Sequence, residues 1–281
     1  MHLIKTKDMK TFKRILILTI GLFLASCTEE IIVDLDTAPP KLVVDAAIEW
    51  YKNTAGNEQK IILSTTTGYY SSEFPTVSGA TIFISNSTNI IFTFVETTTV
   101  GQYECTNFIP VIGETYVLTI ILNGQTYTAT ETLINAPLIE EPIVQNDAGG
   151  FAGDEIEIKY QYQDDNAEEN YYVNSVVNPH VLFPEYSVED DELYNGNKID
   201  MFYSNPDLVP GDVLKIKMFG TSKTYHSYFK QVILASGNDG NPFQTTPTSV
   251  RGNIINQTDA SNNSLGYFRL SEVDTKEYTI Q

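Results

Sequence analysis

The sequence predicts a mainly β protein with one helix. Short runs of β-branched and aromatic residues recur along most of the chain, and turn-forming residues separate them. A helical spacing of apolar residues stands out in one stretch, near residues 223–236. With 17 tyrosines, 14 phenylalanines and a hydrophobic fraction of 42%, the chain can fill a sizeable core. We therefore expect a folded, β-rich body rather than a disordered chain.

Residues 1–26 have the layout of an export signal. Lys10, Lys13 and Arg14 form a positive segment, and residues 15–25 form an apolar run behind it. A bilayer-spanning helix needs about 20 apolar residues, so this run is too short to span. The segment therefore predicts a signal peptide that is removed from the mature protein.

The end of this segment looks like a lipobox. Leu24, Ala25 and Ser26 lead directly into Cys27. Small residues before the cut admit the chain to the signal peptidase, and the cysteine thiol receives the lipid. Fatty chains contribute about 0.8 kcal/mol for each buried methylene, so several chains hold a protein firmly in one leaflet. The sequence predicts a lipoprotein that is acylated at Cys27 and anchored in one leaflet of the bacterial envelope.

The residues after Cys27 bear on which face of the membrane the protein occupies. Glu29 and Glu30 follow closely, and acidic residues at this place resemble a surface-export signal of lipoproteins. Because only two carboxylates are present, the cell surface and the periplasmic face remain equal alternatives. Residues 27–40 end in Pro39-Pro40, which favours extended backbone, so we expect this segment to be the lipidated cysteine and a tether.

Residues 41–135 predict a first β domain. The strand candidates are 42–48, 60–66, 80–84, 90–95, 116–120 and 126–130. Asn123-Gly124 lies between the last two, and this pair tolerates the positive φ angles of a tight hairpin turn. Short strands at this spacing predict a β-sandwich of immunoglobulin-like size. The cysteine and tryptophan spacing of true immunoglobulin domains is missing, so only the architecture is implied.

Residues 136–281 predict a second β-rich domain that carries one amphipathic helix. Its strand candidates are 155–162, 171–173, 213–218, 249–255 and 266–270. Residues 164–170 and 185–200 are acidic and rich in asparagine, so we expect loops there. Near 223–236 the apolar residues follow helical spacing, with Ser222 as the expected N-cap and Gly237 at the expected end.

Charge and cysteine content exclude several classes. The formal net charge is −19, and loss of residues 1–26, which carry five basic residues and one aspartate, makes the mature chain more acidic still. Such a surface repels phosphate backbones, so we expect no nucleic-acid partner. Once Cys27 is acylated, Cys105 has no partner for an intramolecular disulfide. We expect the thiol of Cys105 to point into a β core.

The sequence offers no recognisable catalytic motif, and we expect the protein not to be an enzyme. The mature chain has two histidines, and nucleophile elbows, zinc-binding motifs and phosphate-binding glycine loops are missing from it. The acidic segments are the one site-forming feature, because calcium takes several oxygen ligands from such loops. Asp164, Asp165, Asp190 and Asp191 are therefore candidate calcium ligands. A solvated acidic loop without metal is the alternative, and otherwise no cofactor is expected.

The order and spacing of several segments resemble a known family. These are 41–45 (KLVVD), 77–82 (VSGATI), 101–118 (GQYECTNFIPVIGETYVL), 169–172 (ENYY), 211–213 (GDV), 241–243 (NPF) and 265–268 (LGYF). Together they resemble the Bacteroidota domain-of-unknown-function family 4249. This resemblance covers the chain from the lipobox nearly to the C-terminus.

The resemblance implies an outer-membrane lipoprotein whose gene commonly lies beside that of a TonB-dependent transporter, and it supplies no catalytic residues. We therefore expect an accessory protein that caps such a β-barrel transporter or hands it a ligand. One alternative is a surface glycan-binding module or hydrolase that uses the acidic loops. Another is a structural component of an outer-membrane assembly machine.

Overall fold

A computed structural model of the protein describes residues 39–68, 71, 73–236 and 250–281. Within these residues the chain is mainly β with a single helix, which confirms the predicted class. The strands are β1 (Leu42–Tyr51), β2 (Gln59–Thr65), β3 (Thr81–Asn86), β4 (Ile91–Glu96), β5 (Gln102–Cys105), β6 (Thr115–Leu122), β7 (Gln125–Ile134), β8 (Ile139–Gly149), β9 (Glu155–Gln163), β10 (Tyr171–Val177), β11 (Glu185–Asp190), β12 (Lys198–Asn205), β13 (Val213–Gly220), β14 (Ile255–Asn256) and β15 (Leu265–Thr279). The helix is α2 (Lys223–Ala235).

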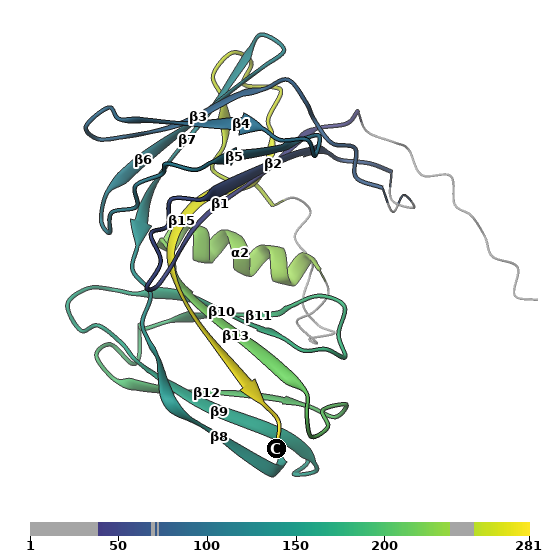
Figure 1. Cartoon of the computed structure of the whole chain (residues 1–281), viewed down its shortest axis with the longest axis vertical. Helices are drawn as coiled ribbons and strands as arrows, with labels where there is room; N and C mark the ends of the chain where they lie inside the picture. The colour runs from purple at the N-terminus through teal and green to yellow at the C-terminus, as the bar shows by residue number, and fades with distance from the viewer. Residues whose placement is uncertain (1–38, 69–70, 72, 237–249) are drawn as a thin grey trace, which may run out of the picture. The chain divides into compact units, whose positions relative to one another are not determined.

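Eight strands form a closed ring of hydrogen bonds. The order is β15-β1-β2-β5-β4-β3-β6-β7, and β7 pairs back onto β15 (Figure 1). β15 runs parallel to both β1 and β7, whereas the other neighbours in the ring are antiparallel. The predicted β-rich character of 41–135 is confirmed, but the C-terminal strand completes its sheet. An immunoglobulin-like classification of this part stays a prediction.

The ring encloses the first hydrophobic core. Alternate residues along each strand point inward, as the pattern of β1 shows, where Val44, Ala46 and Ile48 are fully buried. Cys105 is buried in this core, as expected from its strand position. The predicted Asn123-Gly124 hairpin is confirmed, with φ angles of 50° and 77° between β6 and β7.

A second core lies between two layers of strands. The three-stranded sheet β12-β9-β8 forms one layer, and β10, β13 and the end of β15 form the other. Tyr160, Tyr162, Leu214 and Ile216 are among its buried members. Polar residues that alternate with them, such as Lys215, face outward. The period-two pattern of these strands thus builds a two-layer packing.

β15 contributes to both cores, because it is long and changes neighbours along its length. Phe268 and Leu270 belong to the first core, and Ile280, just beyond the strand, belongs to the second. Residues 39–281 form one compact unit. The predicted division into domains 41–135 and 136–281 stays a prediction.

The parallel pairing of β1 with β15 depends on glycine at the start of β15. Gly266 has a φ of +94°, and a Cβ there would lie 1.9 Å from the carbonyl oxygen of Val44. A Cβ on Gly252 would in turn lie 1.6 Å from the carbonyl oxygen of Gly266. Three backbone segments therefore pack at this point with no room for a side chain.

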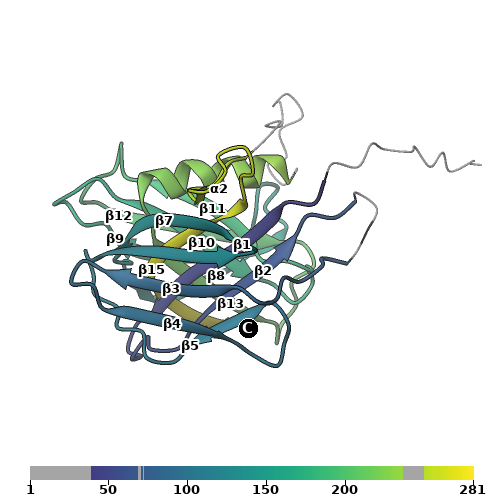
Figure 2. The same cartoon turned by 90° about the horizontal axis from the view of Figure 1, so that it is seen from above.

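Helix α2 lies on the face of β10, β13 and β15 that is turned away from the second core. The predicted N-cap is confirmed, since the Ser222 hydroxyl accepts a hydrogen bond from the Tyr225 amide at 3.2 Å. Tyr225 packs with Val173, Phe219 and Tyr267 in a third cluster. Both views place α2 beside β11 (Figure 1 and Figure 2). The helix ends at the C-cap Ser236, and the predicted terminator Gly237 is outside the described residues.

Two predictions about local structure are wrong. The expected loop at 185–200 contains β11 and the start of β12. The strand expected at 249–255 is missing over the described residues 250–254, because β14 begins only at Ile255. The strand expected at 266–270 is confirmed and is part of the longer β15, whereas β8 lies where no strand was predicted. β8 and β11 are partly exposed, so polar side chains occupy their outer face and hide the apolar signal.

Several predicted features lie in residues that the structure does not describe. They are the signal peptide 1–26, the lipobox residues Leu24, Ala25 and Ser26, the acylation site Cys27, and the export-signal candidates Glu29 and Glu30. Among the residues that are described, α2 is too short and too polar to be a membrane-spanning helix.

Candidate functional site

The face of β1 that points away from the first core borders two hollows. Asp45, Ala47 and Glu49 alternate with the buried residues of β1, and these three residues line both hollows. The hollow of about 440 Å³ between β1, β13, β15 and α2 is here named the α2 pocket. The hollow of about 580 Å³ beside β2 and the β1–β2 turn is named the β2 hollow. Both volumes fall in the range of small-ligand sites.

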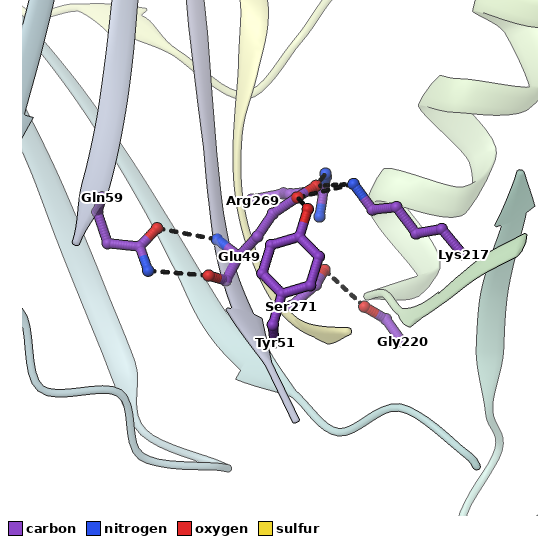
Figure 3. Close-up of polar contacts among 7 residues, drawn as sticks. All are labelled: Glu49, Tyr51, Gln59, Lys217, Gly220, Arg269 and Ser271. Carbon is purple, nitrogen blue, oxygen red and sulfur yellow. Dashed lines mark hydrogen bonds and ion pairs between the residues drawn. The ribbon is translucent and has the colours of Figure 1, made fainter. Parts of the chain in front are cut away.

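Glu49 is the centre of a polar network on this face (Figure 3). Lys217 of β13 donates to both carboxylate oxygens, with its Nζ at 2.6 Å from Oε1 and 2.7 Å from Oε2. Arg269 of β15 donates from Nη2 to Oε1, and the hydroxyl of Tyr51 donates to Oε2 at 2.8 Å. One carboxylate therefore ties together side chains from three strands that are far apart in sequence.

Hydrogen bonds between side chains and backbone hold this network in place. The side chain of Gln59 accepts from the Glu49 amide at 3.0 Å and donates to the Glu49 carbonyl at 2.9 Å. On the other side, Ser271 Oγ donates to the carbonyl oxygen of Gly220 at 2.7 Å, which fastens the end of β13 to β15 (Figure 3). The carboxylate of Glu49 is thus fixed from β2 as well as from its cation partners.

Arg269 is the most deeply buried charged group of the site, with 9% of its side chain exposed. Its guanidinium stacks on the ring of Phe219 at 4.1 Å and lies 5.5 Å from the centre of the Tyr225 ring. Nη2 is used by Glu49, but the buried Nη1 has no hydrogen-bond partner among the described residues. A buried donor left without an acceptor is costly and uncommon in folded proteins.

The charges of the site stabilise one another. Burial raises the pKa of Glu49, but the nearby charges of Arg269 and Lys217 outweigh this effect and lower it to about 2. Burial lowers the pKa of Lys217, and the charge of Glu49 opposes that shift only in part. For Arg269, burial lowers the pKa while Tyr225 and Glu49 raise it, with a net increase. At neutral pH Glu49 is therefore a carboxylate between two cations, and it is not a free general acid.

Aromatic side chains form the walls of the α2 pocket. They come from β11, β13, β15 and α2, and they are Tyr186, Phe219, Tyr225, Tyr228, Phe229 and Tyr267. Tyr225 stacks on Phe229 with a ring-centre distance of 5.4 Å, and Tyr267 meets Tyr225 edge-on at 4.9 Å. The helical spacing that predicts α2 thus also places its aromatic residues at this pocket.

A third hollow of about 640 Å³ lies beyond the aromatic wall. Residues 181–186 and the second half of α2 line it, and it shares Tyr186, Phe229 and Val232 with the α2 pocket. Tyr186 and Phe229 meet edge-on at 5.2 Å between the two hollows. Leu182 and Phe183 of this rim are largely exposed. An exposed apolar rim therefore borders the aromatic wall of the pocket.

The first two candidate calcium ligands, Asp164 and Asp165, accept hydrogen bonds from groups within the protein. Asp164 is buried, and its two oxygens accept from the Tyr172 hydroxyl at 2.7 Å and from the Gly196 amide at 2.8 Å. Asp165 accepts from the amide of Ala167 at 3.0 Å. Asp165 thus stabilises the turn between β9 and β10, and Asp164 joins that turn to β10 and to the segment before β12.

The second candidate pair lies at the end of β11. Asp191 is buried and accepts from the Asn170 amide at 2.8 Å, whereas Asp190 is exposed and pairs with Tyr171 in the β10–β11 ladder. Across residues 39–68, 71, 73–236 and 250–281, the structure brings together no group of three or more His, Cys, Asp or Glu side chains that could hold a metal ion. Calcium binding by the four aspartates therefore stays a prediction without a preformed geometry.

The two histidines of the described region are placed differently. His226 on α2 is buried against the ring of Tyr171 at 5.2 Å, and burial lowers its pKa. His180 is about one third exposed, and its Nε2 lies 2.7 Å from the Asp212 carboxylate. Neither histidine lines the α2 pocket.

The residues that build this site were not predicted from the sequence. Glu49, Lys217 and Arg269 come from strands separated by 168 and 220 positions along the chain from Glu49, and none belongs to a motif. The one available signal was their position: each is a charged residue with an apolar residue on either side of it in its strand. Such a residue must find a partner on a neighbouring strand or face solvent.

Comparisons with solved structures return chains of weak similarity. A segment of two fibronectin type-III domains from chicken tenascin is 13% identical, with a TM-score of 0.22, over 64% of this chain and 90% of that one. A DUF4785 family protein from Legionella pneumophila is 8% identical, with a TM-score of 0.23, over 64% of this chain and 52% of that one. Among curated proteins, no match to this chain is found.

The family comparison covers nearly the whole described chain. A family model described as a domain of unknown function, DUF4249, matches residues 28–277. The match begins directly after Cys27 and includes β1, β13, β15 and α2, which carry the α2 pocket. The resemblance noted in the sequence is confirmed, and the protein belongs to the DUF4249 family.

Proposed function

We propose that this protein is a lipid-anchored accessory of the outer membrane that captures a small ligand in the α2 pocket and serves a TonB-dependent transporter. The single observation that carries the capture role is the pocket itself, where a buried guanidinium with an unused donor adjoins an aromatic wall. Convergent polar groups in an apolar pocket are the usual features of a small-molecule site.

The anchor rests on the lipobox Leu24-Ala25-Ser26-Cys27. A protein confined to one leaflet meets a membrane partner at high effective concentration, so a weak interface suffices for association. This argument holds for the cell surface and for the periplasmic face alike. The partner class comes from the family resemblance, because genes of this family commonly neighbour those of TonB-dependent transporters.

A binding role is favoured over catalysis by the state of the charged groups. Glu49 is held as a carboxylate by two cations, so it is poorly suited to proton transfer near neutral pH. The alternative of a glycan-binding module or hydrolase depends on the acidic loops. Asp164 and Asp191 of those loops are buried and occupied by local hydrogen bonds, which weakens that alternative.

The partnership is tested by cross-linking in intact cells of the source bacterium. The acylated protein, with an affinity tag after Gln281, is cross-linked, solubilised in detergent and purified, and its partners are identified by mass spectrometry. The matched control is Cys27→Ser, which is exported but cannot be acylated. We expect a TonB-dependent barrel to be enriched with the wild-type chain over the control.

Two results would contradict this proposal. One is recovery of the same barrel yield from wild type and Cys27→Ser, which removes the reason for an anchor. The other is recovery of outer-membrane assembly factors in place of a transporter, which supports the structural role in an assembly machine. Protease treatment of intact cells, applied to the same strains, decides between the cell surface and the periplasmic face.

A further inference from the structure

We propose that the ligand of the α2 pocket carries one carboxylate group on an aromatic or apolar body, and that the carboxylate binds Arg269 Nη1. This inference deepens the proposed function, since it names the ligand class of the same pocket. It rests on three observations: an unused buried donor, the charge balance around that donor, and the aromatic lining.

The unused donor is the strongest observation. Arg269 is held rigidly, because Phe219 supports its guanidinium from one side and Glu49 accepts from Nη2. Nη1 makes no hydrogen bond in the described part of the chain, although the residue lines the pocket and, against the opposite effect of burial, the neighbouring Tyr225 raises the pKa of Arg269. Such a donor gains a hydrogen bond when a ligand brings an anionic oxygen to it, and it gives up little hydration in exchange.

The charge balance favours a single negative charge on the ligand. Arg269 and Lys217 supply two positive charges and Glu49 one negative charge, which leaves one positive charge in a largely buried cluster. A carboxylate neutralises that charge. A phosphate group carries close to two negative charges, so it would leave an excess in a desolvated place. The exposed carboxylate of Asp45 at the pocket edge repels either anion, and it repels the phosphate more strongly because of the larger charge.

The lining favours a flat or apolar body attached to the carboxylate. Tyr225 and Tyr228 of α2 are in ring contact with Tyr267 of β15, and with Phe229 they form a continuous aromatic wall of the pocket. Aromatic walls bind planar groups by stacking and edge contacts. The volume of about 440 Å³ is suited to a small molecule and excludes a folded protein segment.

The test uses three probes that share one aromatic body. They are 2-naphthylacetate, its neutral amide 2-naphthylacetamide, and 2-naphthyl phosphate. Binding to the mature acylated protein in detergent micelles is measured by isothermal titration calorimetry. We expect the carboxylate to bind at least about tenfold more tightly than the amide, because a hydrogen bond to a charged group is lost with the amide. We also expect it to bind more tightly than the phosphate.

Two variants locate the binding. Ala47→Phe fills the α2 pocket from β1 without removing a charge, and we expect it to abolish binding of 2-naphthylacetate. Arg269→Met removes the donor and leaves the Glu49–Lys217 pair, and we expect the carboxylate to bind no better than the amide. Glu277→Gln, at an exposed ion pair with Lys215 on the same strands, is the matched control and keeps wild-type affinity. Circular dichroism spectra establish that each variant is folded.

Each outcome decides the inference. A carboxylate preference that disappears in Ala47→Phe supports it even if Arg269→Met fails to fold. Equal affinity for carboxylate and amide, tighter binding of the phosphate, unchanged binding by Ala47→Phe, or no saturable binding of 2-naphthylacetate overturns it. These measurements need no transporter, so the two proposals can fail separately. If the carboxylate binds but no barrel is cross-linked in cells, only the proposed partnership is rejected. If a barrel is cross-linked but the carboxylate does not bind, only the proposed ligand class is rejected.

Discussion

Glu49→Gln tests whether the network on β1 stabilises the fold as well as the pocket. The substitution keeps the shape of the side chain but leaves Arg269 and Lys217 without a counter-charge, and 9% and 27% of their side chains are exposed. The pKa of Glu49 falls from 4.5 to about 2 in the folded protein. At 1.36 kcal/mol for each pKa unit, the charged form stabilises the fold by about 3 kcal/mol at neutral pH. Loss of one partner from a buried ion pair costs a similar amount, about 3–5 kcal/mol.

The pH dependence has a definite sign. Because the pKa of Glu49 is lower in the folded state, its contribution is fully present above pH 4.5 and decreases as the pH falls towards 2. Glutamine does not titrate, so the difference in unfolding free energy between wild type and Glu49→Gln is expected to shrink over this range. Urea denaturation followed by circular dichroism, at a series of pH values from neutral to about pH 3, measures the difference.

The control for this prediction is again Glu277→Gln. Glu277 and Lys215 lie 3.4 Å apart and are mostly exposed, so their pair contributes about 0–1 kcal/mol at most. A loss for Glu49→Gln that equals the loss for Glu277→Gln at neutral pH would refute the reasoning. A difference from wild type that stays constant down to pH 3 would refute it as well.

Three further predictions concern backbone packing, the helix cap and the thiols. Gly266→Ala forces a Cβ against a carbonyl oxygen and should cost about 4 kcal/mol or more in urea denaturation, whereas Gly79→Ala, at φ +78° with open space around it, should cost about 1–2 kcal/mol. Ser222→Ala removes the cap of α2 and should cost about 1 kcal/mol, seen as faster amide exchange in residues 223–235. Burial raises the pKa of the Cys105 thiol, so iodoacetamide should react only after unfolding, and the unfolded mature protein should show one reactive thiol. A second reactive thiol would contradict acylation of Cys27.

Features determined by neighbouring residues could be predicted from the sequence. The Asn123-Gly124 hairpin follows from the positive φ angles that these two residues tolerate. The Ser222 cap and the helix behind it follow from local hydrogen bonding and from apolar spacing. The burial of Cys105 follows from its place in an alternating strand. The family could also be recognised from the sequence, because the resemblance depends on the order and spacing of short segments.

Strands with a solvent-exposed face were harder to predict. β8 and β11 carry acidic and polar side chains along much of their length, so their composition resembles that of a loop. Their identity as strands comes from the partners β9 and β10, which supply the backbone hydrogen bonds. Pairing between strands is a property of the folded chain, and the amino-acid composition of one strand alone predicts it poorly.

The sequence by itself determined the β-rich class, the hairpin and the helix, and it predicts the export signal, because each depends on residues that are close together in the chain. Only the tertiary structure decided that β15 closes the ring beside β1, and that this closure brings Arg269 to Glu49. Their interaction depends on a parallel register across more than 200 residues, for which no local pattern exists. The candidate site is therefore a consequence of strand order, and its chemistry appears only after the chain has folded.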